Sequence, residues 1–353
     1  MIVVGVIVII IALVSFCIDG NFREWHTPAE SWISIISWFR IHLGHLADSD
    51  AWRNRKELIE QMPYYGGVIE RIRLSAMTFG CGMLMALSGS IFQTVFRNPM
   101  AAPTMLGVST GVNVGVLILV LQYGLYAESH LSEKYLYCYI GAGVMLTLVL
   151  VLGKISSGKK RMSVFDLLII GVILSSIIGA IMSFFTMGMD NDVALVYREI
   201  MMMIRMDTSK QAFSILGFAM LISLVPMFML RFSFNAVSFE SDDTRSLGIN
   251  AYLMKIVTLI LGTIMITAAM IHCGSAGMIS LVAPFIARGL FGAEFRRQFW
   301  GNLLIGGGIL LICKDIIGLI PFGTDGIPLG TIVDFVALPV FVLIVVKQKR
   351  VWE

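Results

Sequence analysis

Long runs of apolar residues, separated by short polar connections, recur along this chain of 353 residues. A bilayer core about 30 Å thick needs roughly 20 apolar residues per helix. By that measure the chain has ten segments, near 2–18, 73–96, 104–124, 135–153, 165–188, 211–232, 252–272, 278–291, 300–320 and 328–347. The eighth is short, and whether it crosses fully stays open. Apolar residues make up 57% of the chain and charged residues only 14%, whereas a soluble domain carries about a quarter charged residues. The sequence therefore predicts an all-α polytopic membrane protein with about ten transmembrane helices and one membrane domain over residues 1–353.

Lysine and arginine orient the chain, because they collect on the cytoplasmic side of a membrane protein. They cluster after the fourth segment (154–161), after the eighth (288–297) and in the tail (347–350), and with ten crossings all three places share one face. The first segment lacks a basic start and a small-residue cleavage site, so we expect it to be retained. We predict a multi-pass membrane protein with both termini cytoplasmic.

The long first loop, residues 19–70, is predicted to be extracytoplasmic. Trp32, Ile35, Ile36 and Phe39 have helical spacing, which favours an interfacial helix lying on the membrane lipid. Basic residues are unusual on this side and indicate a partner; they are Arg53, Arg55, Lys56, Arg71 and Arg73.

No catalytic or metal-binding pattern is evident. The five cysteines are scattered without a C-x-x-C pair. Residues 153–160 nearly spell a phosphate-binding loop, but Lys160 stands where a hydroxyl would hold Mg²⁺. We expect this chain to bind no cofactor and no metal, so that any ATP and Mg²⁺ are bound by a partner ATPase. The net charge of +3 is too small to indicate a nucleic-acid partner.

The stretch 97–111 is the most informative motif. Pro99 ends a helix, because proline disfavours the helical conformation of the residue before it. Small residues such as Gly107 and Ser109 then allow close helix approach. From the residues alone, this is a turn between two spans.

In full, however, the stretch resembles the FecCD-type permease subunits of ABC importers for iron-siderophores, haem and vitamin B12. Residues 97–111 follow their pattern R-N-P-L-A-x-P-x-x-L-G-V-S-x-G, and 86–89 read A-L-S-G as in the preceding span. Matches at 247–249, 274–288, 328–330 and 339–341 extend the resemblance over most of the chain. Leu74 and Phe285 depart from the family, whose members have arginine and histidine there.

The resemblance implies a homodimer in a bacterial inner membrane. It would move a metal chelate inward by alternating access, with cytoplasmic ATP-binding-cassette subunits and an extracytoplasmic substrate-binding protein as partners. The loop 233–250 resembles the helices that couple to the ATPase, through Glu240, Asp242, Asp243, Arg245, Ser246, Leu247 and Gly248. Arg71 matches a docking position for the binding protein, supported by Arg73, Arg53 and Arg55. The translocation path and its structural motif comprise Gly89, Gln93, Arg97, Asn98, Pro99, Gly107, Ser109, Ser175, Ser176, Gly179, Pro284 and Asp334. A solvated acidic loop remains the alternative for 233–250.

Two charges inside the last spans stand apart from the family pattern. Lys314 and Asp334 each lie about six residues from the outer membrane boundary, which corresponds to a depth of about 9 Å. Because intramembrane charges usually pair, we predict a Lys314–Asp334 ion pair. In the alternative, Asp334 faces a water-filled path and Lys314 pairs with Asp315. An ion- or proton-coupled secondary transporter using Asp334 is the rival function.

Overall fold

The computed structural model describes residues 1–15, 65–157, 164–202, 207–237, 251–292, 294–319 and 327–352. Within these ranges every regular element is helical, as the sequence predicts. The elements are α1 (Ile2–Ser15), α5 (Tyr65–Phe96), η1 (Pro103–Leu106), α6 (Val108–Tyr123), η2 (Gly124–Ser129), α7 (Leu131–Ser157), α8 (Val164–Met187), α9 (Asn191–Met202), α10 (Lys210–Val237), α12 (Ala251–Cys273), α13 (Ile279–Phe291), α14 (Phe295–Leu319) and α15 (Leu329–Trp352). The predicted interfacial helix near Trp32 lies outside the described residues.

Each of the ten predicted segments coincides with a helix, but the number of crossings is not confirmed. Seven helices are long and apolar enough to cross a membrane, and three apolar stretches are shorter: Ile2–Ser15, Ile279–Phe291 and Leu329–Val342. The 13 residues of α13 span about 20 Å, less than a bilayer core. The helix α9 was not predicted. One face of α9 is buried or half-buried, and it carries Val193, Val196, Tyr197 and Ile200. Their spacing of three and four residues is that of the apolar face of an amphipathic helix.

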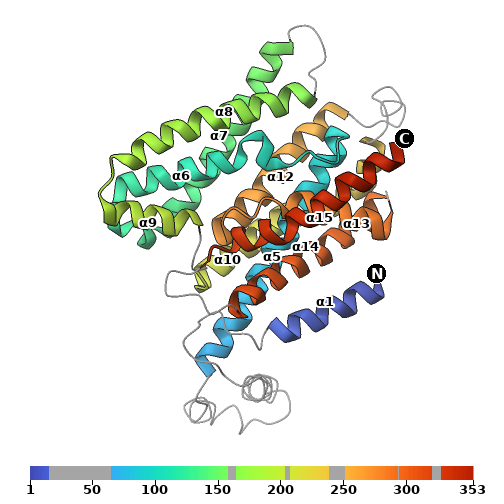
Figure 1. The fold of residues 1–353 in the computed structure, drawn as a ribbon, viewed down its shortest axis with the longest axis horizontal. Coiled ribbons are helices and arrows are strands. Elements are labelled where there is room, and N and C mark those ends of the chain that lie inside the picture. The colour runs from blue at the N-terminus through green and yellow to red at the C-terminus, as the bar shows by residue number, and fades with distance from the viewer. Residues whose placement is uncertain are drawn as a thin grey trace.

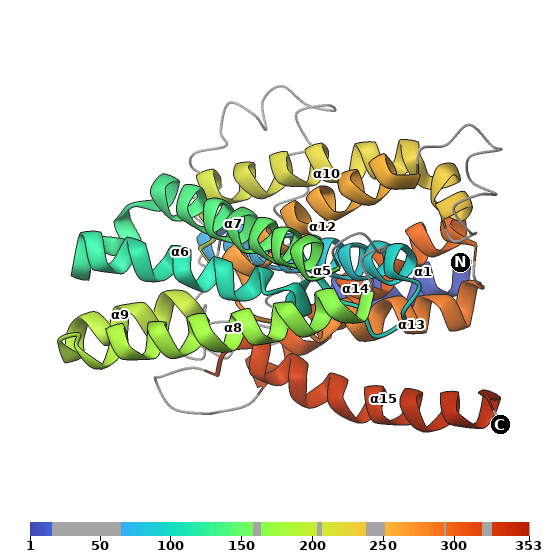
Figure 2. The same ribbon diagram turned by 90° about the horizontal axis from the view of Figure 1, so that it is seen from above.

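The helices α5, α12 and α14 form the centre of the bundle (Figure 1). In α5 and α12, 78% of the apolar stretch is buried, against 17% in α8 and 22% in α10. Seen from above, α10 lies on one side of this centre, while α8 and α15 lie on the opposite side (Figure 2). The exposed faces of α8 and α15 therefore belong to the same side of the molecule.

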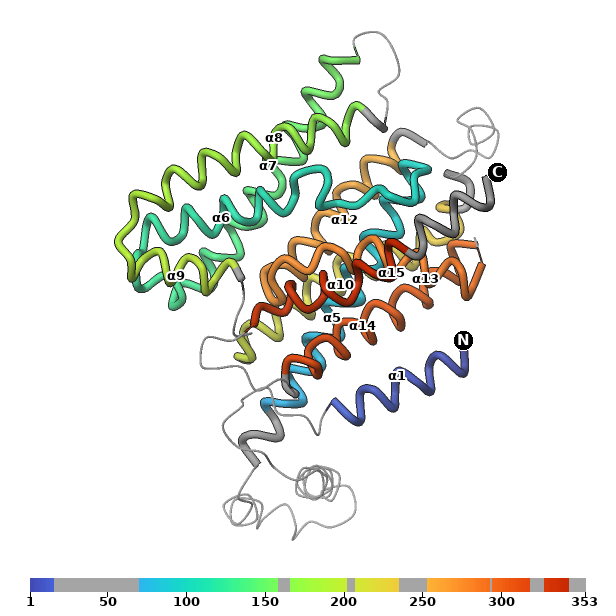
Figure 3. Tube along the Cα trace, viewed as in Figure 1, coloured from blue at the N-terminus to red at the C-terminus, as the bar shows by residue number. Residues whose placement is uncertain are grey.

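The helix α1 lies at the edge of the bundle beside α14 (Figure 3). Only Val8 and Ser15 of α1 are buried. The start of α1 and the end of α15 lie at the same end of the bundle. This end also carries the connection from α13 to α14.

Candidate functional site

The end of α5 is shaped by an arginine in a left-handed conformation. Arg97 has φ 50°, its N–H donates to the carbonyl of Thr94 (3.3 Å), and the N–H of Asn98 donates to the carbonyl of Gln93 (3.1 Å). This is a Schellman cap, a motif in which the left-handed position is usually glycine. A left-handed conformation costs about 1–2 kcal/mol for a residue with a side chain. The cap therefore carries a strain that packing or function must offset.

The chain then turns back into the protein. The side-chain Oδ1 of Asn98 accepts from the N–H of Met100 (2.9 Å), and the carbonyl of Asn98 accepts from the N–H of Ala101 (3.0 Å). Pro99 occupies the second position of this turn, where its fixed φ fits. The following residues 101–103 are fully or almost fully covered and lead into η1.

Gly107 joins η1 to α6 with φ 76° and ψ 9°, a conformation that favours glycine. A Cβ at this position would lie 2.5 Å from the Cε of Met145 and 2.9 Å from the Oγ of Ser175. Both the backbone and the space therefore require glycine here. The contact brings α7 and α8 together on the turn, with Ser109 half-buried in the first turn of α6.

The predicted residues on α5 meet the segment 274–288, which lies almost 200 positions later in the chain. Gln93 donates from Nε2 to the carbonyl of Leu281 (3.2 Å), and its Oε1 accepts from Nη2 of Arg288 (3.5 Å). At Gly89 a Cβ would lie 1.7 Å from the carbonyl oxygen of Ser280, so the two backbones are in direct contact. Pro284 is buried in the same helix, α13. The contact of Gln93 with Arg288 was not predicted from the sequence.

The three predicted path residues of α8 have different surroundings. Ser175 is half-buried and faces the turn at Gly107, whereas Ser176 is exposed. The hydroxyl of Ser176 donates to the carbonyl of Val172 (2.9 Å), and Gly179 has open space where a side chain would be. The exposed face of α8 therefore offers the satisfied hydroxyl of Ser176 and the open position of Gly179 between apolar side chains. Asp334, on α15, is exposed on the same side of the molecule.

The predicted Lys314–Asp334 ion pair is wrong in this structure. The Nζ of Lys314 lies 3.0 Å from Oδ1 of Asp315, the partner in the alternative interpretation. It also donates to the Oγ of Ser15 (2.8 Å), the Oγ of Ser75 (3.0 Å) and the carbonyl of Ser15 (3.3 Å). Ser15 in turn donates from Oγ to Oδ1 of Asp315 (2.9 Å). Matched depth did not make Asp334 the partner, because α1 brings a serine hydroxyl and a carbonyl to Lys314 from another side.

The docking and coupling predictions are only partly described. Arg71 is buried, with 7% of its surface exposed, so it presents little charge to a partner in this conformation. Arg73 is half-buried. Arg53, Arg55 and the coupling residues between 240 and 248 lie outside the described ranges.

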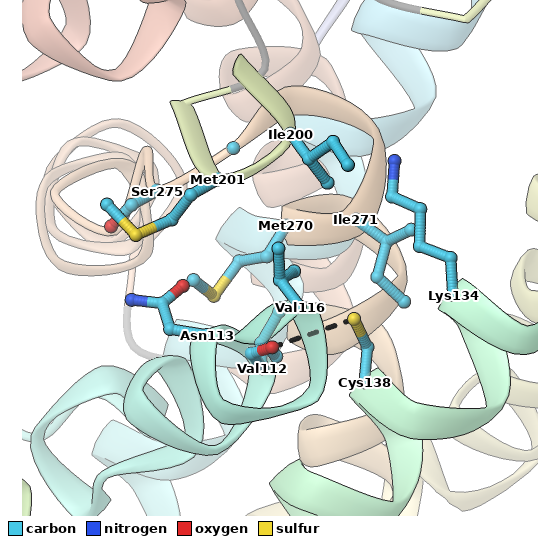
Figure 4. A pocket seen from close by; sticks show the side chains of 11 residues that line it. Val112, Asn113, Val116, Lys134, Cys138, Ile200, Met201, Met270, Ile271 and Ser275 are labelled. Carbon is cyan, nitrogen blue, oxygen red and sulfur yellow. Dashed lines mark hydrogen bonds between the residues drawn. The ribbon is translucent and has the colours of Figure 1, made fainter. Parts of the chain in front are cut away.

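A small cavity lies where α6, α7, α9 and α12 meet (Figure 4). It is lined by Val112, Asn113, Val116, Lys134, Cys138, Ile200, Met201, Met270, Ile271, Gly274 and Ser275. Its volume of about 10 Å³ suits a single water molecule and excludes a chelate. In the described part of the chain, no group of three or more histidine, cysteine or carboxylate side chains is arranged to hold a metal ion.

Comparison with known proteins agrees with this arrangement. A sequence model described as the FecCD transport family matches residues 48–347. A probable iron chelatin transport system permease of Helicobacter pylori is 26% identical, over 83% of this chain and 86% of its own length. The hemin transport system permease of Yersinia pestis is 26% identical, over 78% and 81%. A solved structure titled as an inward-facing conformation of a putative metal-chelate type ABC transporter shares the fold, with a TM-score of 0.72 and 19% identity, over 98% of this chain and 97% of the other.

Proposed function

Because this chain belongs to the FecCD transport family, we propose that it is the membrane permease of an ABC importer that moves a metal chelate into the cell. Permeases of this family work with separate ATPase and substrate-binding subunits. The relatives carry iron chelatin and hemin by name, so an iron-siderophore, haem or cobalamin is the cargo class proposed here. This chain itself would bind no cofactor, while ATP and Mg²⁺ would bind to the ATPase subunits.

The observation that carries the proposal is the exposure of Asp334 on α15 and of Ser176 on α8, two helices that lie on the same side of the molecule. An isolated carboxylate such as Asp334 is costly in hydrocarbon, so its exposure requires water or a partner beside it. On the same side of the molecule, α8 contributes Ser176 and Gly179, which project little into the space outside the chain. Two copies facing each other through this side would enclose a wide, weakly binding path for a bulky chelate. The homodimer is part of the proposal.

Energy would enter at the cytoplasmic loop 233–250. Its described beginning, at the end of α10, is mechanically tied to the start of α14, because the ring of Phe234 stacks on that of Phe295 at a centroid distance of 4.6 Å. The helix α14 packs in turn along the central α5. A movement of the loop, driven by the ATPase, would therefore reach the core of the permease and open the path by alternating access.

Cysteine cross-linking tests the path and the dimer together. Ser176→Cys, in a background without the five native cysteines, places a thiol on the proposed path. Leu221→Cys is the matched control, because Leu221 is 64% exposed on α10, on the opposite side. A water-soluble bis-maleimide should join two copies of the Ser176→Cys chain and leave the Leu221→Cys chain monomeric. Failure of Ser176→Cys, or equal cross-linking of both, would contradict the proposed face.

A second candidate rests on the same carboxylate. An exposed membrane carboxylate is the group on which ion- and proton-coupled transporters depend, so Asp334 favours a secondary transporter as the rival. The rival predicts that Asp334→Asn abolishes uptake and that no ATPase is needed. The ABC importer requires the ATPase whatever residue occupies position 334.

A further inference from the structure

A cavity of about 420 Å³ opens at the end of the bundle where α1 and α14 begin. It is lined by Met1, Glu294, Arg296, Arg297 and Trp300. The helix α1 touches α14 further along, where Val8 meets Gly308 and Ser15 reaches Lys314. Near the cavity the side chains of α1 are exposed and apolar; Ile2 is 84% and Val3 71% exposed. The cavity therefore opens beside a helix surface that is stable only against hydrocarbon.

The charge of the cavity is positive. Arg297 forms an ion pair with Glu294, whose Oε2 lies 3.1 Å from its Nε. Arg296 has no ion-pair partner among the described residues, and its guanidinium lies 5.7 Å from the ring centre of Phe232. Two arginines and one carboxylate leave a formal surplus of one positive charge. A guanidinium is planar and matches two oxygens of a phosphate at once.

One aromatic ring, that of Trp300, lines the cavity, and rings of α10 and α14 pack against it. Trp300 is 45% exposed, and its ring packs edge-on against Phe299 (5.3 Å) and Phe228 (5.9 Å). The guanidinium of Arg231 lies over Phe228, 3.7 Å from the ring centre. Tryptophan and arginine side chains together are typical of the boundary between headgroups and acyl chains.

From these three features we propose that the cavity binds the phosphate headgroup of an anionic phospholipid. Arg296 and Arg297 contact the phosphate, Trp300 lies at the glycerol level, and an acyl chain follows the exposed side of α1. A lipid is favoured over a soluble anion because the apolar surface of α1 continues directly from the cavity. The volume falls in the range of about 300–1,000 Å³ that small-molecule sites occupy. This assignment does not depend on the cargo or on the ATPase.

Quenching of tryptophan fluorescence by brominated lipid tests the proposal. The full-length chain is placed in nanodiscs of phosphatidylcholine that contain a minor fraction of brominated phosphatidylglycerol or, for comparison, brominated phosphatidylcholine. Subtracting the signal of Trp300→Phe isolates the contribution of Trp300 from the other five tryptophans. We expect the anionic lipid to quench Trp300 more strongly than the neutral one. Arg296→Gln should weaken that preference about fivefold, the effect of removing one arginine near an anionic lipid.

Lys154→Gln is the matched control, because it removes one exposed positive charge at the end of α7, away from the cavity. It should leave the preference unchanged. If Arg296→Gln does not fold, Arg297→Gln measures the same effect. Equal quenching by both lipids, or an equal effect of Lys154→Gln and Arg296→Gln, would overturn the proposal. So would displacement of phosphatidylglycerol by free inorganic phosphate at the same concentration, since the site would then recognise a soluble anion.

Discussion

Replacing Lys314 by methionine should strongly destabilise the protein. The ammonium of Lys314 contacts Asp315, both the hydroxyl and the carbonyl of Ser15, and the hydroxyl of Ser75, at 2.8–3.3 Å. Methionine keeps the apolar stem but leaves Asp315, among the described residues, with the Ser15 hydroxyl 2.9 Å away as its remaining polar contact. Both charged residues are 7% exposed, so water cannot replace the lost cation. Removing one partner of a buried ion pair costs about 3–5 kcal/mol, and we expect a loss of that size in the free energy of unfolding.

The double variant Lys314→Met/Asp315→Leu should lose less than Lys314→Met alone. It removes both charges together, and exchanging a buried pair for apolar residues is often close to neutral. The free energy of unfolding is measured in mixed micelles by titration with sodium dodecyl sulfate, followed by circular dichroism. The double-mutant cycle of Lys314 and Asp315 should give a coupling energy of at least about 2 kcal/mol. We expect it to be smaller than the full cost of the broken pair.

The matched cycle uses Asp334→Asn with Lys314→Met. Because Asp334 makes no ion pair with Lys314 here, these two effects should add to within about 0.5 kcal/mol. The reasoning fails if the Lys314–Asp315 cycle is additive. It also fails if the coupling appears with Asp334 instead.

Three further predictions concern the helix α5, the Arg97 cap at its end and the loop 233–250. Gly89→Ala should unfold or misassemble the protein, because the new Cβ would lie 1.7 Å from a backbone oxygen. Gly143→Ala is the control, because a Cβ there has nothing within 4 Å. It should be neutral or raise the free energy of unfolding by up to about 1 kcal/mol in the same titration. Arg97→Gly should raise the free energy of unfolding by about 1 kcal/mol because it relieves a positive φ; an unchanged or lower value would show that the side chain's contacts outweigh the strain. Replacing Asp242 and Asp243 by lysine should abolish stimulation of the partner ATPase in the assembled complex, and undiminished transport would remove the loop 233–250 from the coupling mechanism.

The positions of the helices could be predicted because the length of an apolar run limits what it can form. Each predicted segment, from 2–18 to 328–347, coincides with a helix. The short segment 278–291 coincides with α13, whose 13 residues span about 20 Å, less than a bilayer core. The helix α9 was missed because its apolar residues cover one face only, and the search was for continuous apolar runs.

Contacts between helices were harder to predict, because sequence gives depth along a helix but not the neighbour across it. Lys314 and Asp334 have matched depths, yet the structure pairs Lys314 with Asp315. Successive residues on a helix point about 100° apart, and the long lysine side chain bridges that angle to reach Asp315. The sequence did offer one signal for the contact between α1 and Lys314, namely Ser15 at the end of the first apolar run. A serine hydroxyl there needs a hydrogen-bond partner within the bundle.

The central claim is that a separate ATPase powers transport through this chain, and reconstitution tests it most directly. The purified permease is placed in vesicles with and without its ATPase subunits, and uptake of a labelled metal chelate is measured with its binding protein outside. The account predicts uptake only when the ATPase and internal ATP are both present, and none with a sodium or proton gradient alone. Accumulation by the permease alone, driven by either ion gradient, would contradict it.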